Sequence, residues 1–190
     1  MVGKKGSVKP RKTISKTIAE HGAKAGEMVD IVTKGDKVTK TVSRVEAMEK
    51  GLRYRFVQVL VFTPERELWV QWRSRHKMIC PRQFSASAGG VVEAGQTYEE
   101  AALCELQEEL GVTGVDVVEV GRYTVDGKEP YNAAVFACQY DGDDLTGWEE
   151  EADALDVMTE EELMFLKERF PYLLASGFVK ALEMLEGDEA

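Results

Sequence analysis

The sequence predicts an α+β fold, a layered α/β/α sandwich in which a mixed β-sheet lies between helices. Three observations support this class. Apolar segments typical of strands stand on both sides of one segment with helical periodicity. Two further helical segments close the chain, and strands combined with helices in this order are typical of layered α and β structure. A chain of 190 residues is long enough for one domain with a sizeable core.

The first half of the chain consists mainly of predicted strands. Residues 28–44 predict two strands joined by a Gly-Asp turn. Residues 53–62 and 67–73 predict a hairpin across the segment TPER. The first strand of this hairpin is a nearly continuous apolar run, as expected of a strand buried on both faces. Residues 85–92 predict another extended segment.

The next segment predicts a helix with clear ends. Thr97 and Glu100 have the spacing of a capping box, and Gly111 stands where a left-handed residue ends many helices. At 100° per residue the apolar side chains gather on one stripe, which we expect to face the core. The residues of this stripe are Ala102, Leu103, Leu106 and Leu110.

The second half of the chain predicts strands at residues 115–125 and 132–141. An acidic loop is expected at residues 142–156. Two C-terminal helices follow. One begins at Thr159 with a Thr-x-x-Glu capping box, and the other begins near Pro171, a residue favoured in a first helical turn.

The net charge of −10 is unevenly distributed along the chain. Residues 1–26 carry seven basic groups and one acid, which gives 7 − 1 = +6 and leaves −16 for residues 27–190. We expect residues 1–26 to be a disordered basic arm and residues 27–190 to be a single domain. The acidic body argues against nucleic acid as a partner.

The cysteines and the apolar segments bear on the compartment. Cys80, Cys104 and Cys138 are an odd number without a CxxC pair, which suits a reducing compartment. No segment approaches the roughly 20 apolar residues that cross a bilayer, so no membrane association is expected. The cytoplasm is the expected location, and organellar targeting by the basic arm is the alternative. The sequence leaves the oligomeric state open, a homodimer included.

Three acids gather within the predicted helix. Glu105, Glu108 and Glu109 stand at positions i, i+3 and i+4, where like charges repel, and the helix contains no lysine or arginine. A solvated acidic face is one interpretation, and a bound cation is the other. The whole chain has two histidines, far apart, so a hard cation bound through oxygen, Mg²⁺ or Mn²⁺, is the favoured metal.

The metal interpretation implies a particular chemistry. Gly89, Gly90 and Gly95 precede the helix and would let the backbone approach a ligand closely. A divalent ion would neutralise a leaving phosphate and lower the pKa of bound water, while a free glutamate removes a proton. The residues therefore favour metal-assisted attack of water on a phosphoanhydride.

Residues 90–112, GVVEAGQTYEEAALCELQEELGV, resemble the signature of the Nudix hydrolases, Gly-x5-Glu-x7-Arg-Glu-U-x-Glu-Glu-x-Gly-U, where U is a bulky aliphatic residue. The matching positions are Gly90, Glu105, Leu106, Glu108, Glu109, Gly111 and Val112. The resemblance extends over roughly residues 28–186 and implies an α/β/α sandwich. It also implies divalent-metal-dependent hydrolysis of a phosphoanhydride bond, in a nucleoside diphosphate linked to another moiety or a related small diphosphate.

The resemblance assigns roles to individual residues. Glu105, Glu108 and Glu109 would hold the metal. Glu105 and Glu109 would take part in catalysis together with Glu151, which aligns with a downstream glutamate often used as an additional ligand or base. The alternative for Glu151 is an ordinary surface acid. Glu105 or Glu151 would be the general base.

Two positions depart from the signature. Gln96 stands where the family has glutamate, and Cys104 where it has an arginine that orients the acidic cluster. Loss of that positive charge would leave the three glutamates more repulsive without metal. The alternative function is therefore a noncatalytic Nudix-like module that binds a nucleotide. We favour activity because all three helix glutamates are present.

Three segments resemble a branch that is shared with isopentenyl diphosphate isomerases, namely MVDIVTKGDKVTKTVSRVEAMEKGLRYRFVQVLVF, LWVQWRSR and SASAGGVVEAGQ. Those isomerases need a catalytic cysteine and metal-binding histidines. Here Ala88 stands at the approximate place of the cysteine, and Tyr54 stands where a histidine is expected. An isomerase is therefore the less favoured alternative.

Substrate contacts are expected from a few further residues. Arg73 and Arg75 follow a predicted strand, and the arginine fork suits phosphate oxygens, although exposed salt bridges are the alternative. Gly90 would bring backbone close to the substrate. Four aromatic residues are candidates for stacking on a base, with core packing as the favoured interpretation. They are Trp69, Trp72, Phe84 and Tyr131.

Overall fold

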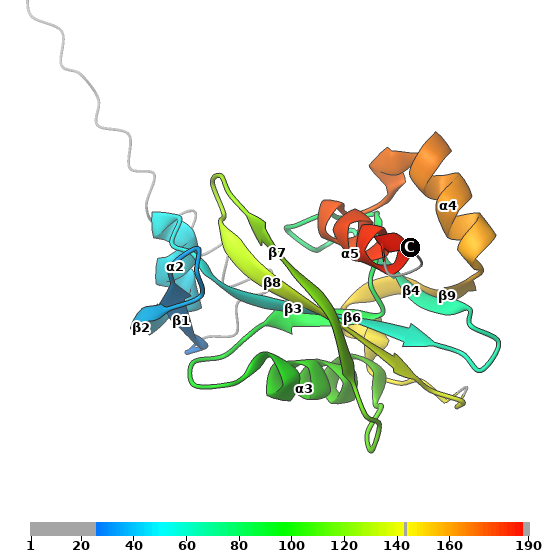
Figure 1. Cartoon of the computed structure of the whole chain (residues 1–190), viewed down its shortest axis with the longest axis horizontal. Helices are drawn as coiled ribbons and strands as arrows, with labels where there is room; N and C mark the ends of the chain where they lie inside the picture. The colour runs from blue at the N-terminus through cyan, green and yellow to red at the C-terminus, as the bar shows by residue number, and fades with distance from the viewer. Residues whose placement is uncertain (1–25, 143, 188–190) are drawn as a thin grey trace, which may run out of the picture.

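The computed structural model describes residues 26–142 and 144–187. Apart from Gly26, the predicted basic arm lies outside these residues, so its disorder stays a prediction. Figure 1 shows a twisted sheet with helices on both sides, which confirms the predicted α+β class. None of the helices in these two ranges is long and apolar enough to cross a membrane.

Within the described ranges the central sheet has seven strands in the order β5-β4-β3-β8-β7, with β6 paired to β3 and β9 paired to β4. The strands are β3 (Tyr54–Phe62), β4 (Leu68–Arg73), β5 (Phe84–Ser85), β6 (Ala88–Val91), β7 (Val118–Val125), β8 (Tyr131–Gln139) and β9 (Ala152–Met158). The pair β3–β8 is parallel and the others are antiparallel, so the sheet is mixed as predicted.

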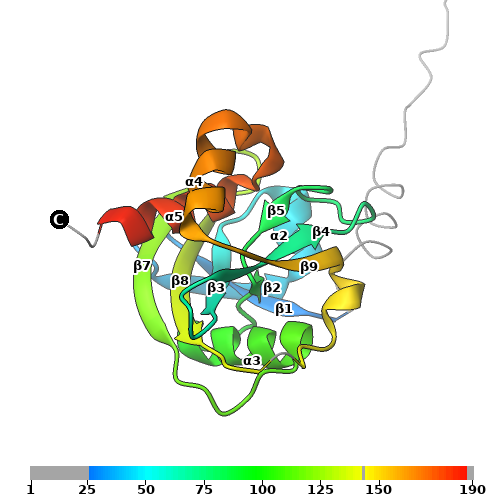
Figure 2. The ribbon, with the colours of Figure 1, turned by 90° about the vertical axis from the view of Figure 1, so that its right-hand side faces the viewer.

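The helices form the outer layers. Helix α3 (Tyr98–Leu110) covers one face of the sheet, and α4 (Glu160–Arg169) with α5 (Ser176–Gly187) covers the other (Figures 1 and 2). Two core clusters follow from this arrangement, one between α3 and the sheet and one between α5 and the sheet. Strand β3 contributes Val57 and Val59 to the first and Leu60 to the second, so its apolar run is buried on both faces.

A small subdomain precedes the central sheet. Strands β1 (Met28–Val32) and β2 (Val38–Ser43) pair antiparallel as predicted. The sequence interpretation missed the following helix, α2 (Arg44–Lys50). Its signals are present in the sequence, because the Ser43 side chain accepts a hydrogen bond from the backbone of Glu46, and a left-handed glycine, at φ 59°, ends the helix.

The hairpin formed by β3 and β4 is confirmed. The predicted acidic loop at 142–156 is wrong over its last part, because residues from Ala152 onward form β9. This strand pairs with β4 along its length, from Leu68 to Arg73. The pairing satisfies the backbone of an edge that would otherwise be open, and it depends on a partner about 80 residues away that local sequence does not reveal.

The last helix begins later than predicted. The segment Pro171–Leu173 forms a single turn of 3-10 helix, and α5 starts at Ser176. Between them Leu174 is extended, and the backbone N–H of Ala175 donates to the carbonyl of Phe84 at 2.8 Å. This contact with β5 interrupts the helix, so the prediction of a helix near Pro171 is wrong by about one turn.

Helix α3 has the predicted ends, with both halves of the Thr97–Glu100 capping box formed and Gly111 in the left-handed region. The predicted core stripe is partly wrong. Leu103 is 39% exposed, while Ala101 and Glu109 are buried. The buried face is therefore rotated away from Leu103, since β6 and β3 pack against the side of the helix that carries Ala101, Ala102 and Glu109.

Candidate active site

Glu109 lies within the buried face of α3 and is only 9% exposed. Its Oε2 accepts two hydrogen bonds, one from Gln71 Nε2 at 3.0 Å and one from the backbone N–H of Gly89 at 3.2 Å. Burial, reinforced by the negative charges of Glu105 and Glu151, raises the pKa of Glu109 to about 8. A carboxyl group in this position holds its proton near neutral pH unless a positive charge compensates it.

Glu105 lies directly above Gly90, the second glycine of β6. A Cβ atom added to Gly90 would stand 1.9 Å from Glu105 Oε1, far inside van der Waals contact. The Glu105 carboxylate can therefore occupy this position only because residue 90 has no side chain. The register of β6, in which Gly90 pairs with Val57 of β3, fixes the glycine beneath the helix.

These acids line one cleft of about 510 Å³. The predicted acids Glu105, Glu108, Glu109 and Glu151 all line it, and so does Gly90 of strand β6. Glu151 follows the 3-10 turn Trp148–Glu150 and is paired with Lys77, which lines the same cleft. Glu151 is therefore a cleft residue with a side-chain partner rather than an isolated surface acid.

The two predicted arginines differ in position. Arg73, at the end of β4, lines the cleft, and its Nε donates to the carbonyl of Ile79 at 3.1 Å. Arg75 does not line the cleft, and its Nε donates to His76 Nε2 at 3.2 Å. Only Arg73 is placed to meet a ligand of the cleft.

The two departures from the signature contact each other. Gln96 Nε2 donates to Cys104 Sγ at 3.7 Å, and Gln96 Oε1 accepts from the backbone N–H of Glu93 at 3.1 Å. Both side chains line the cleft. A glutamate and an arginine at these positions would be oppositely charged neighbours, and this chain has a neutral pair in their place. The two changes are therefore complementary, and together they leave the net charge unaltered.

Of the four aromatic candidates, one lines the cleft and three do not. Tyr131 lines the cleft, whereas Trp69, Trp72 and Phe84 do not. Trp69 packs against the α3 core, Phe84 packs against the α5 core, and Trp72 meets Phe84 with ring centroids 4.7 Å apart. Core packing, the favoured interpretation, is thus what the structure shows for these three.

Three residues of the site were not predicted from the sequence. Lys77, which pairs with Glu151, and Gln58 of β3 line the cleft, whereas Gln71 of β4 is buried behind it and donates to Glu109. Two of them had a signal, because Gln58 and Gln71 are polar residues with apolar residues on both sides in their strands. A buried glutamine in such a strand needs hydrogen-bonding partners. Lys77 lies in a loop and had no comparable signal.

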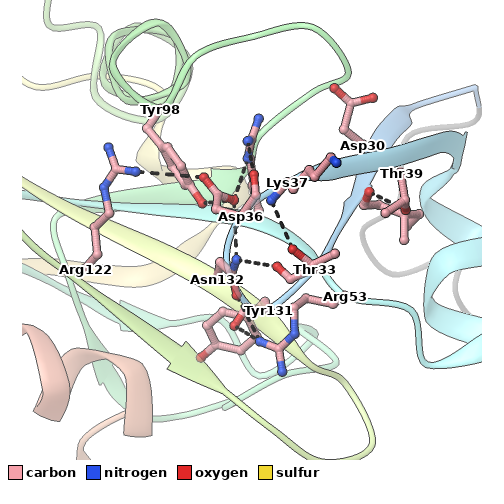
Figure 3. Close-up of polar contacts among 12 residues, drawn as sticks. Asp30, Thr33, Asp36, Lys37, Thr39, Arg53, Tyr98, Arg122, Tyr131 and Asn132 are labelled. Carbon is pink, nitrogen blue, oxygen red and sulfur yellow. Dashed lines mark hydrogen bonds and ion pairs between the residues drawn. The ribbon is translucent and has the colours of Figure 1, made fainter.

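Asp36 ties the β1–β2 hairpin to the start of α3 (Figure 3). Its Oδ1 accepts hydrogen bonds from Arg55 Nε at 2.8 Å, from Tyr98 Oη at 3.1 Å and from Asn132 Nδ2 at 3.3 Å. These donors, in which the Arg55 guanidinium supplies a positive charge, outweigh desolvation and lower the pKa of Asp36. Nearby, Asp30 accepts from the backbone N–H of Gly95 at 3.0 Å. The hairpin thus holds the loop that leads into the acidic helix.

We expect Asp36→Ala to destabilise the fold by about 1–3 kcal/mol. The change leaves three hydrogen-bond donors without their acceptor and places alanine in the left-handed region, at φ 64°. Asp36→Asn is the matched control, since asparagine tolerates this φ and keeps an acceptor oxygen, so its cost is expected to be smaller. Urea unfolding of both variants measures the difference. Equal stability of Asp36→Ala and wild type would show that these contacts do not hold the hairpin.

Comparison with known proteins agrees with this geometry. The NUDIX domain family model matches residues 52–175. The Nudix hydrolase SCO1686 of Streptomyces coelicolor is 41% identical over 91 residues, which cover 48% of this chain and 50% of that protein. The matched region thus spans half the length of this relative.

Two solved structures share the fold. The crystal structure of DR0079 from Deinococcus radiodurans has a TM-score of 0.70 at 22% identity, over 83% of this chain and 98% of that one. The NUDIX domain of NrtR from Shewanella oneidensis, solved with ADP-ribose, has a TM-score of 0.57 at 12% identity, over 78% and 100% of the two chains. Because the family model covers more than half of the chain, and includes the helix that carries the glutamates, this protein belongs to the Nudix hydrolase family.

Proposed function

We propose that this protein hydrolyses a phosphoanhydride bond of a small diphosphate, such as a nucleoside diphosphate linked to another moiety, with Mg²⁺ or Mn²⁺ as cofactor. The observation that carries the proposal is Glu109, an acid buried beside the negative charges of Glu105 and Glu151. Concentrating acids in a buried site is unfavourable without a compensating charge. A divalent cation supplies that charge.

The donor set fits such an ion. Carboxylate oxygens are the ligands that Mg²⁺ and Mn²⁺ prefer, and magnesium is commonly held by a few carboxylates together with waters and substrate phosphates. In the ranges 26–142 and 144–187 no three histidine, cysteine or acidic side chains, as they lie, are grouped so that they could hold a metal ion. The proposal therefore rests on ligand chemistry and on the shared cleft, with Glu105, Glu108 and Glu109 as the residues that would hold the ion.

When bound, the ion would offset charge on the phosphates and lower the pKa of a coordinated water. The chain's own groups supply the rest. Glu105 or Glu151 would accept the proton of the attacking water, and Lys77 holds the Glu151 side chain at the cleft wall. Arg73 and Gly90 both line the cleft, and the Arg73 guanidinium and the Gly90 backbone would contact phosphate oxygens. Arg75 lies outside the cleft lining, so we leave it out of the proposal.

Phosphate release from a panel of diphosphates, with Mg²⁺, with Mn²⁺ and with EDTA, tests the function. We expect turnover that requires the metal, and a loss of about a hundredfold or more in Glu105→Gln, because that variant removes a metal ligand and a candidate base. Glu99→Gln is the matched control, since Glu99 is an exposed acid of the same helix outside the cleft lining. Absence of turnover by wild type, or equal turnover by Glu105→Gln, would overturn the proposal.

A noncatalytic module that binds a nucleotide is the alternative raised by Gln96 and Cys104. Their direct contact supports activity, because the neutral pair replaces a charged pair without adding charge to the cleft. Tight nucleotide binding without turnover, unchanged by Mg²⁺, would favour the binding module instead. An isomerase is not supported, since Ala88 has no thiol, Tyr54 is buried, and neither residue lines the cleft.

A further inference from the structure

The cleft that contains the glutamates has a second, uncharged end. It is formed by strands β3, β7 and β8 and by the N-terminal turn of α5, on the face of the sheet opposite α3. Its lining residues are Phe56, Gln58, Tyr123, Tyr131 and Gly177. Tyr131 is the candidate of this group for stacking on a base, and the proposed hydrolysis uses none of these side chains.

Gln58 presents a hydrogen-bond donor to this end of the cleft. Its side chain is buried, with 6% of the residue exposed. The amide oxygen accepts from Tyr123 Oη at 2.9 Å, whereas the amide nitrogen donates to no group within residues 26–142 and 144–187. Gln58 Nε2 is not one of the fully buried atoms that lack a partner in these ranges, so it reaches the cleft surface, where water or a bound molecule can accept its hydrogen bond. Since Gln58 lines the cleft, a molecule bound there can satisfy it.

The start of α5 keeps this donor accessible. A Cβ atom on Gly177 would stand 2.9 Å from Tyr123 Oη, 3.3 Å from Gln58 Nε2 and 3.5 Å from Tyr131 Oη. The three polar groups therefore converge on a helix position that lacks a side chain. Phe56 adds an apolar wall, with its ring centroid 5.7 Å from that of Tyr131. The surface offers hydrogen bonding together with aromatic contact.

The charge of this end limits what it can bind. The charged side chains that line the neighbouring wall, Arg44 and Glu27, are paired with each other at 3.0 Å. Gln58, the two tyrosines and Phe56 offer no charge to a second phosphate, and Lys180, whose Nζ lies 6.0 Å from the centroid of the Tyr123 ring, is outside the cleft lining. An alkyl chain would bury the Gln58 donor without satisfying it, which is unfavourable. The complementary group is uncharged, carries a hydrogen-bond acceptor and is flat enough to contact aromatic rings.

The two ends of the cleft adjoin at β6. Gln58 pairs in register with Gly89, and the backbone N–H of Gly89 donates to Glu109. We infer that Gln58 is a specificity-determining residue, which recognises an uncharged, hydrogen-bond-accepting ring group attached to the diphosphate that the glutamates act on. This inference rests on the proposed hydrolysis for its diphosphate. A nucleobase and a sugar ring share the required chemistry.

The first test compares kcat/KM for diphosphates that carry a ring group, such as nucleoside diphosphates joined to sugars, with kcat/KM for methyl diphosphate. We expect wild type to prefer the ring-bearing substrates at least tenfold. Gln58→Met, of similar size, is expected to reduce this preference by about tenfold to a hundredfold and to leave methyl diphosphate within about twofold. Gln83→Met makes the same chemical change outside the cleft, where Gln83 binds the carbonyl of Tyr172, and is expected to change neither.

An equal fall on both kinds of substrate, or no change in the ratio, would overturn the inference. Tyr131→Phe removes one hydroxyl group from the same end of the cleft and should also lower the preference for ring-bearing substrates. This second variant keeps the inference testable if Gln58→Met fails to fold. Adenosine and ribose are the probes for a second test, binding to metal-free protein followed by NMR. Loss of binding of either probe in Gln58→Met supports the inference. Because adenosine itself contains ribose, loss of binding of adenosine alone identifies the base, and loss of binding of both probes identifies the sugar.

The two tests separate the two proposals. If wild type cleaves no diphosphate while Gln58-dependent binding of a probe persists, the proposed hydrolysis fails and the binding site stands. If the protein cleaves diphosphates but neither probe binds and the ratio is insensitive to Gln58, the hydrolysis stands and the inference is overturned.

Discussion

Glu109→Gln is expected to lower metal-dependent turnover strongly and to stabilise the metal-free protein. The pKa of Glu109 is raised to about 8 from an ordinary value of 4.5, so the folded state keeps a proton that the unfolded state releases. The contribution of Glu109 to the free energy of unfolding is therefore fully present below about pH 4.5 and is lost as the pH rises towards 8. At pH 7 the neutral glutamine avoids a penalty of about 3 kcal/mol. Turnover should fall by about a hundredfold or more, because a metal ligand is removed.

Urea unfolding in EDTA at pH 5, 6, 7 and 8 measures the stability effect. The difference in the free energy of unfolding between Glu109→Gln and wild type should grow by about 1.4 kcal/mol per pH unit in this range. Glu183→Gln, at an exposed position of α5, is the control and should run parallel to wild type. Mg²⁺ should then stabilise wild type at pH 8 and have little effect on Glu109→Gln. A variant no more stable than wild type at any pH would contradict the buried, proton-holding carboxyl described above.

Gly90→Ala is expected to remove activity while leaving the fold intact. The added Cβ would stand 1.9 Å from Glu105 Oε1 and 2.4 Å from its Cδ, so the carboxylate must leave its place. The three atoms nearest to the added Cβ all belong to the end of this flexible side chain, which can move without the backbone. We expect turnover to fall by about a hundredfold, since a misplaced catalytic group is costly, with a change in stability of less than about 1 kcal/mol.

Gly89→Ala provides the contrast. Its Cβ would stand 2.7 Å from the carbonyl oxygen of Val57, a backbone atom of the central strand, so the sheet itself must shift. We expect this variant to unfold at lower denaturant, by about 1–3 kcal/mol. Activity and unfolding measured together separate the two glycines. Loss of stability in Gly90→Ala equal to that in Gly89→Ala would show that Gly90 has a general packing role rather than a role in placing Glu105.

Much of the fold could be predicted from local sequence. The ends of α3 depend on Thr97, Glu100 and Gly111, which act within one turn of the helix, and the structure has them where the pattern places them. The apolar run of β3 likewise predicted a strand covered on both faces. Helix α2 was missed although its capping signals are local, so that error was one of interpretation rather than of missing information.

Other features depend on partners far away in the chain. Strand β9 forms because β4 offers an open edge, and α5 is delayed because Ala175 pairs with the backbone of β5. The local sequence of β9 does not reveal its pairing with β4, and the local sequence around Ala175 does not reveal its contact with β5. The local propensity of an acidic, loop-like segment was overridden by sheet pairing, as happens often for edge strands.

The sequence by itself determined that three glutamates lie on one helix at i, i+3 and i+4 spacing, after a glycine-rich turn, because helical geometry converts spacing into proximity. Only the tertiary structure decided that they are not equivalent. Packing of α3 against β6 and β3 buries Glu109, gives Glu105 the space above Gly90, and brings Glu151 to the same cleft with Lys77. Burial and neighbouring charge set the chemistry of a carboxyl group, and both depend on which distant strands pack against the helix.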